Sequence, residues 1–262
     1  MNSSTTTLTT SEDIARDLRD LGISSGDLAC LHVSLSALGF VPGGSRAVIE
    51  GVVEALDGGT LMMPNYSGDL FDPAEWQHPP VPSDWVELIL EATPAYDPER
   101  TPTRGMGVVA EYFRSFPGVI RSAHPQSSFA ARGPLAERVL SPHPLDNRFG
   151  PDGPLGRLKS MNGWVVLMGA PWDTVSLFHM TQHLVGWSTS VAKSAPILEN
   201  DKEIWASYSD IEYPIDWFED AVQMLLKSGL AKTGSVGGAA TVVFKSDAAI
   251  DEVVGWRKKE NR

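Results

Sequence analysis

Short apolar runs alternate with stretches of helical periodicity along this chain. The runs at 28–33 (LACLHV), 60–64 (TLMMP) and 164–170 (WVVLMGA) are typical of strands buried on both faces of a sheet. Between the first two lies 43–59, an amphipathic helical pattern with glycines at both ends. This alternation predicts an α/β protein whose helices cover both faces of a central sheet.

Further elements follow the same pattern. A helix is expected from Thr10, where Asp13 completes a capping pattern, to about Gly22. We expect other helices at 105–115, 214–228 and from Ser246, and strands at 203–209 and 240–244. With 262 residues, no internal repeat and no Gly/Ser-rich linker, the chain is predicted to form a single domain over 1–262. We expect an α/β/α layered fold with a mixed central sheet and a flexible segment at 1–10.

One segment, 66–104, breaks the pattern. It holds seven prolines together with tryptophans and acids, as in FDPAEWQHPPVPSDW, and only 84–92 suggests a short helix. Long irregular segments inside compact domains are usually functional. We therefore interpret 66–104 as a substrate-facing insertion.

Composition restricts the partners. The chain has 21 Lys and Arg against 33 Asp and Glu, a net charge of −12, which argues against nucleic-acid binding and would attract a polycationic small molecule. The start, MNSSTTTLTT, lacks the basic region of a signal peptide, and the apolar runs are too short for a membrane span. A single cysteine, Cys30, excludes an internal disulfide. A cytoplasmic protein is expected, with its oligomeric state open.

Two histidines, His179 and His183, lie four residues apart in SLFHMTQH, a spacing that places both on one helix face. A zinc protease helix would have glutamate directly after the first histidine, where this chain has Met180, and zinc also needs a third ligand. The alternatives are a catalytic base at His179, or two structural histidines. The helix that carries His179 follows a buried strand and a turn, and Asp173 or Thr174 can cap it.

Three other segments carry candidate chemistry. CLHVSLSALGFVPGGS (30–45) runs from a strand through a glycine-rich loop to a helix start, where backbone N–H groups favour anions; His32 and Ser34 should point the same way. IRSAHPQSSFAARGP (120–134) places polar side chains before a strand. SYSDIEYP (207–214) puts Asp210 and Glu212 on one side of an extended segment, where two carboxylates repel unless a cation lies between them.

Together these segments resemble the aminoglycoside 3-N-acetyltransferases, the antibiotic N-acetyltransferase family, which is distinct from the GNAT acetyltransferases. The resemblance extends over nearly the whole chain. It rests on LHVSLSALGFVPGG, GGTLMMPNYS followed by FDP, RSAHPQSSFAARGPLAE, PLDNRFGPDGPLGRL, VVLMGAPWDTVSLFH and GSVGGAATVVF.

The resemblance implies acetyl-CoA as co-substrate, no metal, and an aminoglycoside as the polycationic acceptor, with antibiotic resistance as the outcome. It assigns catalytic roles to His179, Gln182 and Glu212, with Gln182 where the family usually has a glutamate that orients the histidine. The implied cofactor-binding residues are His32, Ser34, Leu35, Gly43, Gly44, Arg121, Ser122, His124 and Thr174. The implied substrate-binding residues are Asn65, Tyr66, Asp69, Asp72, Asn147 and Asp210.

On this interpretation His179 is a general base, and the acceptor amine attacks the thioester directly in a ternary complex. Cys30 lies in a core strand and is a poor acyl carrier. Three alternatives stay open: an acyltransferase of the same fold acting on another small amine, a zinc hydrolase built on His179 and His183, and a non-catalytic CoA-binding relative.

Overall fold

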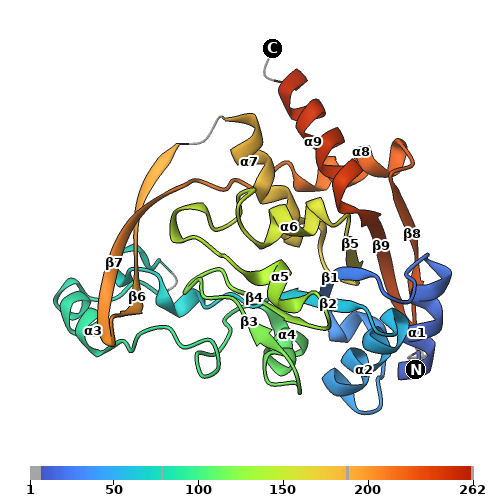
Figure 1. Ribbon diagram of the computed structural model, residues 1–262, viewed down its shortest axis with the longest axis horizontal. Helices are drawn as coiled ribbons and strands as arrows, with labels where there is room; N and C mark the ends of the chain where they lie inside the picture. Colours follow the sequence, from blue (N-terminus) through green and yellow to red (C-terminus); the bar gives the residue numbers. More distant parts are fainter. Residues whose placement is uncertain (1–6, 78, 187–188, 261–262) are drawn as a thin grey trace, which may run out of the picture.

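The computed structural model describes residues 7–77, 79–186 and 189–260. Within these ranges, seven strands form one sheet in the order β3-β4-β2-β1-β5-β9-β8 (Figure 1). Their bounds are β1 Leu28–Val33, β2 Thr60–Pro64, β3 Ile120–Arg121, β4 Phe129–Arg132, β5 Trp164–Met168, β8 Ala231–Val236 and β9 Ala239–Lys245. Strands β2, β1 and β5 are parallel and the outer pairings are antiparallel, which confirms the predicted mixed sheet.

Helices cover both faces of this sheet. The α-helices are α1 Ser11–Asp20, α2 Gly44–Leu56, α3 Val86–Ala92, α4 Gly107–Arg114, α5 Ala136–Leu140, α6 Pro154–Ser160, α7 Met180–Val185, α8 Phe218–Lys227 and α9 Ser246–Glu260. Helices α1, α2 and α4 share one core with Leu31 and Met168, whereas α5, α6, α8 and α9 share the other with Cys30 and Leu167. Consecutive strand residues thus enter opposite cores, as the pleat of a strand requires.

The start of the chain is anchored to this fold from residue 7 onward. Thr9 is buried, and its hydroxyl donates to the Leu38 carbonyl over 2.6 Å. Thr10 caps α1 in a reciprocal capping box with Asp13, as predicted. Residues 7–10 of the segment predicted to be flexible make these contacts, and its first six residues lie outside the described ranges. Flexibility at 1–10 stays a prediction.

The insertion at 66–104 packs against a separate two-stranded ribbon, formed by β6 Ser190–Glu199 and β7 Lys202–Ile211 (Figure 1). The indole N–H of Trp205 in β7 donates to the Leu90 carbonyl of α3, and the Tyr96 amide donates to Pro196 of β6. The sequence predicted α3 and most of β7 but not β6. Much of the insertion therefore packs against this ribbon.

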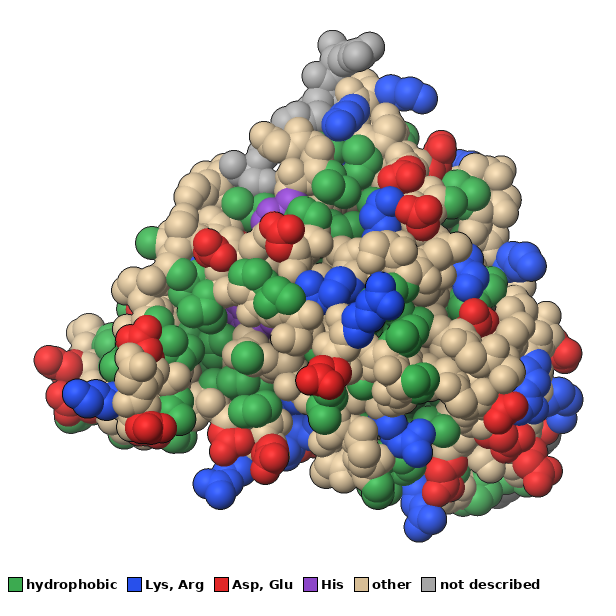
Figure 2. Space-filling view, viewed as in Figure 1, with side chains coloured by type: hydrophobic (Ala, Val, Ile, Leu, Met, Phe, Trp, Pro, Cys, Tyr) green, Lys and Arg blue, Asp and Glu red, His purple; other side chains and the backbone are tan. Residues whose placement is uncertain are grey.

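Two findings concern the surface and possible membrane spans. Acidic and basic side chains are interspersed over the face shown in Figure 2, without a continuous basic area. In the described ranges no helix is both long and apolar enough to cross a bilayer.

Candidate active site

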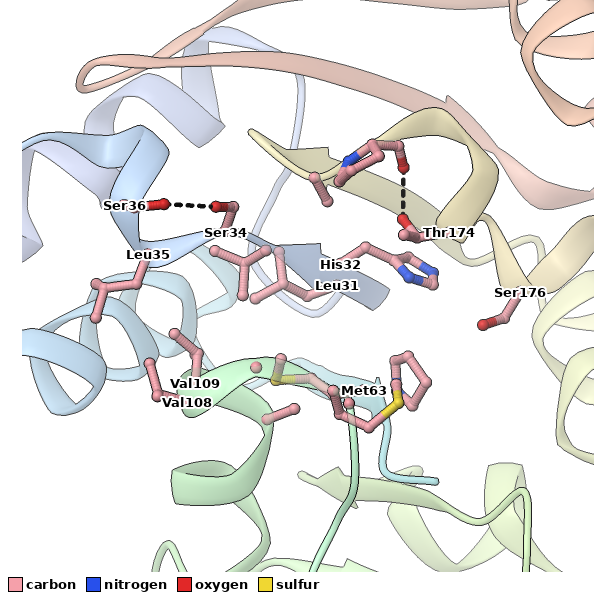
Figure 3. Close-up of a pocket in the computed structure, with 18 of the residues that line it drawn as sticks. Leu31, His32, Ser34, Leu35, Ser36, Met63, Val108, Val109, Thr174 and Ser176 are labelled. Carbon is pink, nitrogen blue, oxygen red and sulfur yellow. Dashed lines mark hydrogen bonds between the residues drawn. The ribbon is translucent and has the colours of Figure 1, made fainter. Parts of the chain in front are cut away.

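A cavity of about 840 Å³ opens at the carboxyl ends of the parallel strands β1, β2 and β5 (Figure 3). Ligands of α/β proteins commonly bind at this edge. Its described lining comes from the end of β1 and the loop after it, the end of β2, the start of α4, and the segment after β5, and is mostly apolar. Leu31, Leu35, Val41, Met63, Val108, Val109 and Ile215 are among these apolar residues. The one charged side chain among the described lining residues is Asp173.

Polar groups in the cavity come mainly from two loops. His32 and Ser34 both line it, as their alternation on β1 predicted, and the Ser34 hydroxyl lies 3.1 Å from that of Ser36 (Figure 3). Burial lowers the pKa of His32 to about 4, so this imidazole is neutral at pH 7. Thr174 also lines the cavity, but its hydroxyl donates to the Pro171 carbonyl over 2.6 Å.

Two helices begin at the cavity. Gly44 starts α2 and Gly107 starts α4, and both line the cavity, whereas Gly43 precedes α2 in a left-handed conformation (φ 87°) and does not. Neither helix has an acidic residue in its first turn. The free N–H groups of helix starts attract anions, so this side of the cavity suits a phosphate group.

His179 lines the cavity at the end of a short 3₁₀ turn, Ser176–His179, that leads directly into α7. Ser176, at the start of this turn, lies across the cavity from Val108 and Leu35 (Figure 3). No side chain caps this turn, so the expected caps Asp173 and Thr174 are not used. Part of the imidazole is open to the cavity, but the ring lies deep in the protein, and burial, with a smaller effect of the Arg148 charge, lowers its pKa to about 3.

Gln182 and His183 lie further along α7 and contact other residues. Gln182 is buried, and its amide nitrogen donates to the Pro214 carbonyl over 3.0 Å. His183 places Nε2 2.8 Å from the Tyr213 hydroxyl. No cluster of three or more His, Cys, Asp or Glu side chains suited to a metal occurs within the described residues, so the ligand set of the zinc alternative is not found there.

Asp210 and Glu212 do not form the expected pair. Asp210 is buried at the end of β7, and its Oδ2 lies 2.9 Å from Nε of Arg148. Its Oδ1 accepts a hydrogen bond from the Tyr213 hydroxyl over 2.8 Å. Glu212 follows the strand and is exposed. The two carboxylates therefore differ in environment, because the strand ends at Ile211.

The predicted substrate residues are also dispersed. Tyr66 lines the cavity and donates to the Ser176 hydroxyl over 2.6 Å, whereas Asn65 is buried outside it and donates to the Ala110 carbonyl. Among the acids, Asp69 pairs with Arg104 at 2.6 Å, and Asp72 accepts from the Ala74 amide and the Ser194 hydroxyl. Asn147 donates to Asp152 over 3.2 Å. None of the four residues Asn65, Asp69, Asp72 and Asn147 is among the described cavity lining.

Three predicted cofactor residues, Arg121, Ser122 and His124, lie outside the cavity lining and are bound within the protein. Arg121 donates to the carbonyls of Thr101 and Asn65. The Ser122 hydroxyl lies 2.9 Å from Nδ1 of His143 and accepts from the Phe129 amide, and His124 Nδ1 accepts two backbone amides. Their side chains hold the loop before β4.

Sequence reasoning missed several residues around His179 and the cavity. Phe149 stacks on the His179 ring at 4.5 Å between centroids, and Arg148 lies beside both Phe149 and Tyr213. The RFG in PLDNRFGPDGPLGRL has no catalytic signal of its own and entered only through the resemblance. The GMGVV stretch at 105–109 was predicted only as the start of a helix, although its glycines and valines line the cavity.

Comparison with known proteins decides the family. The model of the aminoglycoside 3-N-acetyltransferase family matches residues 30–258. The chain belongs to the aminoglycoside 3-N-acetyltransferase family. Membership confirms the predicted family, the acyltransferase class and, with the observed layers, the fold class.

Individual relatives of this acetyltransferase chain cover nearly its whole length. The SPbeta prophage-derived aminoglycoside N(3′)-acetyltransferase-like protein YokD of Bacillus subtilis is 38% identical over 97% of this chain and 94% of its own. Aminoglycoside N(3)-acetyltransferase IX of Micromonospora chalcea is 33% identical over 93% and 91%.

Solved structures of related proteins agree with this acetyltransferase fold. The crystal structure of YokD matches with a TM-score of 0.94 at 37% identity, covering 97% of this chain and 94% of YokD. AAC-IIIb, solved as a binary complex with CoASH, matches with a TM-score of 0.85 at 29% identity and 97% coverage of both chains. Sisomicin-bound AAC-VIa matches with a TM-score of 0.87 at 28% identity, covering 97% of this chain and 99% of the other.

Proposed function

We propose that this protein transfers the acetyl group of acetyl-CoA to an amine of an aminoglycoside, the 3-amino group of its deoxystreptamine ring, and so confers antibiotic resistance. The observation that carries the proposal is the position of His179, a neutral imidazole at one side of an apolar cavity whose other side holds two helix starts. The related AAC-IIIb binds CoASH, and the related AAC-VIa binds sisomicin.

Coenzyme A fits the chemistry of the cavity. Its pyrophosphate suits the N–H groups at the starts of α2 and α4, near Gly44 and Gly107. Its pantetheine arm suits the apolar lining between these helices and His179. In this arrangement His32, Ser34, Leu35 and Thr174 contact the cofactor, and the thioester lies near His179.

The reaction proceeds in a ternary complex. The acceptor nitrogen attacks the thioester carbonyl carbon, a C–N bond forms, and the carbonyl electrons move to oxygen. As this bond forms the nitrogen becomes acidic, so the neutral imidazole of His179 accepts its proton in spite of a low pKa. Collapse of the intermediate breaks the C–S bond, and the proton passes to the leaving sulfur.

One further side chain has a role in this scheme, and another is excluded from it. Ser176, held by Tyr66, lines the cavity beside His179 and is a donor for the developing oxyanion. Cys30 is fully buried, and burial raises the pKa of its thiol to about 12, which disfavours an acetyl-cysteine intermediate.

A second candidate is acetylation of a different small amine by the same machinery. The acids expected to bind ammonium groups are engaged within the protein, Asp210 with Arg148 and Asp69 with Arg104. An acceptor with less positive charge would need fewer free carboxylates.

The test measures the release of CoA from acetyl-CoA in the presence of a panel of purified amines. A thiol reagent detects the released CoA. The panel contains aminoglycosides with a 3-amino group, matched aminoglycosides that lack it, and monoamines. Turnover confined to the first group supports the proposal. Turnover of monoamines alone identifies the second candidate, and CoA binding without any transfer contradicts both.

A further inference from the structure

Three aromatic side chains surround the imidazole of His179. Phe149 stacks on it at 4.5 Å with an interplanar angle of 16°, Tyr213 meets it edge-on at 5.3 Å, and Phe218 lies at 5.0 Å. We call Phe149, Tyr213 and Phe218 the aromatic cage. Within the described part of the chain, the buried Nδ1 of His179 has no hydrogen-bond partner. The ring is therefore held there by packing.

A buried ion pair packs against the aromatic cage. Arg148 and Asp210 pair at 2.9 Å, with side chains 11% and 0% exposed. The guanidinium lies 5.3 Å from the centre of the Phe149 ring and 4.7 Å from that of Tyr213, within the range of cation–π attraction. The same cation thus contacts two of the three rings.

Tyr213 connects the ion pair to the imidazole. Its hydroxyl donates to Oδ1 of Asp210 over 2.8 Å and lies 2.8 Å from Nε2 of His183, while its ring edge meets His179. Both oxygens of Asp210 are therefore engaged, because the other faces Arg148. Releasing this carboxylate to bind an acceptor would leave a buried arginine unpaired, at a large cost.

We propose that the aromatic cage, tied through Tyr213 to the Arg148–Asp210 pair, positions the His179 imidazole for proton transfer. The cage performs the orienting role that the family resemblance assigns to a glutamate at the position of Gln182. Asp210, Arg148, Tyr213 and Phe149 are positioning residues, and Asp210 acts through Tyr213. The kinetic part of this proposal rests on the proposed function of His179.

The first experiment separates positioning from acceptor binding. Phe149→Leu removes the stacked ring, and Tyr213→Phe keeps its ring but removes the hydroxyl. We expect each to lower kcat by about tenfold with the acceptor KM unchanged within about twofold. Phe116 is a half-buried phenylalanine whose ring lies tilted against that of Tyr112, away from His179. Phe116→Leu is therefore the control and leaves both constants unchanged.

A double-mutant cycle tests the role of Asp210. If Asp210 acts through Tyr213, the pair Asp210→Asn and Tyr213→Phe together lowers kcat no further than the more damaging single change. The proposal is overturned if Asp210→Asn raises the acceptor KM at unchanged kcat while Tyr213→Phe changes neither constant. That result would show that Asp210 binds the acceptor.

A second experiment does not need an acceptor. Diethyl pyrocarbonate modifies accessible imidazoles, and mass mapping of peptides measures its rate at His179 alone. A ring released from the cage reacts several-fold faster in Phe149→Leu, and more modestly in Tyr213→Phe, than in wild type or Phe116→Leu. Equal rates in all four proteins contradict the cage even if no aminoglycoside is acetylated.

Discussion

At the scale of single residues, the His179 imidazole is surrounded by the rings of Phe149, Tyr213 and Phe218, which come from other segments of the chain. His179 follows a buried strand, and this placement pointed to the cavity edge. Its partners Phe149 and Arg148 could not be found the same way, because a ring stack or ion pair between distant segments leaves no local pattern. Asp210 illustrates the same limit: its position on β7 was readable, whereas its burial against Arg148 was not.

Replacement of His179 tests the proposed base. His179→Ala should lower kcat by at least about 100-fold, because a general base of this kind contributes about that much. Affinity for CoA should stay within about threefold of wild type, since the apolar lining and helix starts are unchanged. His179→Gln fills the aromatic cage without supplying a base, so equal losses in both variants assign the effect to proton transfer. Wild-type turnover in either removes His179 from the mechanism.

At the scale of elements, local signals located most helices and core strands. The capping box at α1 and the apolar runs of β1, β2 and β5 were readable because they are short-range patterns. Strand β6 was missed, although Asn200 and Asp201 both have positive φ at the tight turn between β6 and β7, where this residue pair is favoured. Strand β3 is two residues long and has no periodicity to detect.

The start of α4 provides a test of phosphate binding. Val108 lines the cavity, is 63% exposed, and lies in the first turn of α4. Val108→Glu adds a negative charge beside the proposed pyrophosphate site and should raise the Kd for CoA by roughly tenfold at low salt, about 1.4 kcal/mol. Val108→Gln has the same shape without the charge and should stay within about threefold. Isothermal titration measures the Kd of both variants for CoA. Equal affinities in the two variants would contradict phosphate binding at the start of α4.

At the scale of the whole molecule, composition predicts classes of partner but does not choose a substrate. The absence of nucleic-acid binding and the cytoplasmic location stay predictions, because net charge and apolar content carry no geometry, and the oligomeric state stays open. The layered fold was predictable, since alternating strand and helix patterns permit few arrangements. The ribbon that packs on the insertion was not, because it lies apart from the main sheet (Figure 1).

Buried histidines give the whole molecule a defined response to acid. Burial lowers the pKa of His32 and His143 to about 4, that of His179 to about 3, and that of His124 well below its ordinary value. The unfolded chain binds protons at these residues near pH 6.5, whereas the folded chain does not. The stability that these histidines contribute is therefore complete above pH 6.5 and falls as the pH drops towards 4. At pH 5 the loss is about 2 kcal/mol for each of His32, His143 and His179.

Urea unfolding at pH 7.5 and pH 5.0 measures this loss. His32→Gln removes one titrating imidazole and should reduce the difference in unfolding free energy between the two pH values by about 2 kcal/mol. The carboxyl groups with lowered pKa values, Asp13 and Glu111 at about 2, act only at lower pH. A free energy of unfolding that is equal at both pH values would contradict neutral buried histidines.

The anchored start of the chain has a practical consequence for handling the protein. Thr7 and Thr9 bond to Phe40 and Leu38, and Phe40 lines the cavity. Gly39 permits this close approach, since a Cβ there would lie 2.2 Å from the Thr7 carbonyl oxygen. An affinity tag or truncation that disturbs residues 7–9 therefore acts on the wall of the cavity. Purification tags belong after α9, which contributes none of the described cavity lining and ends at the opposite edge of the molecule (Figure 1).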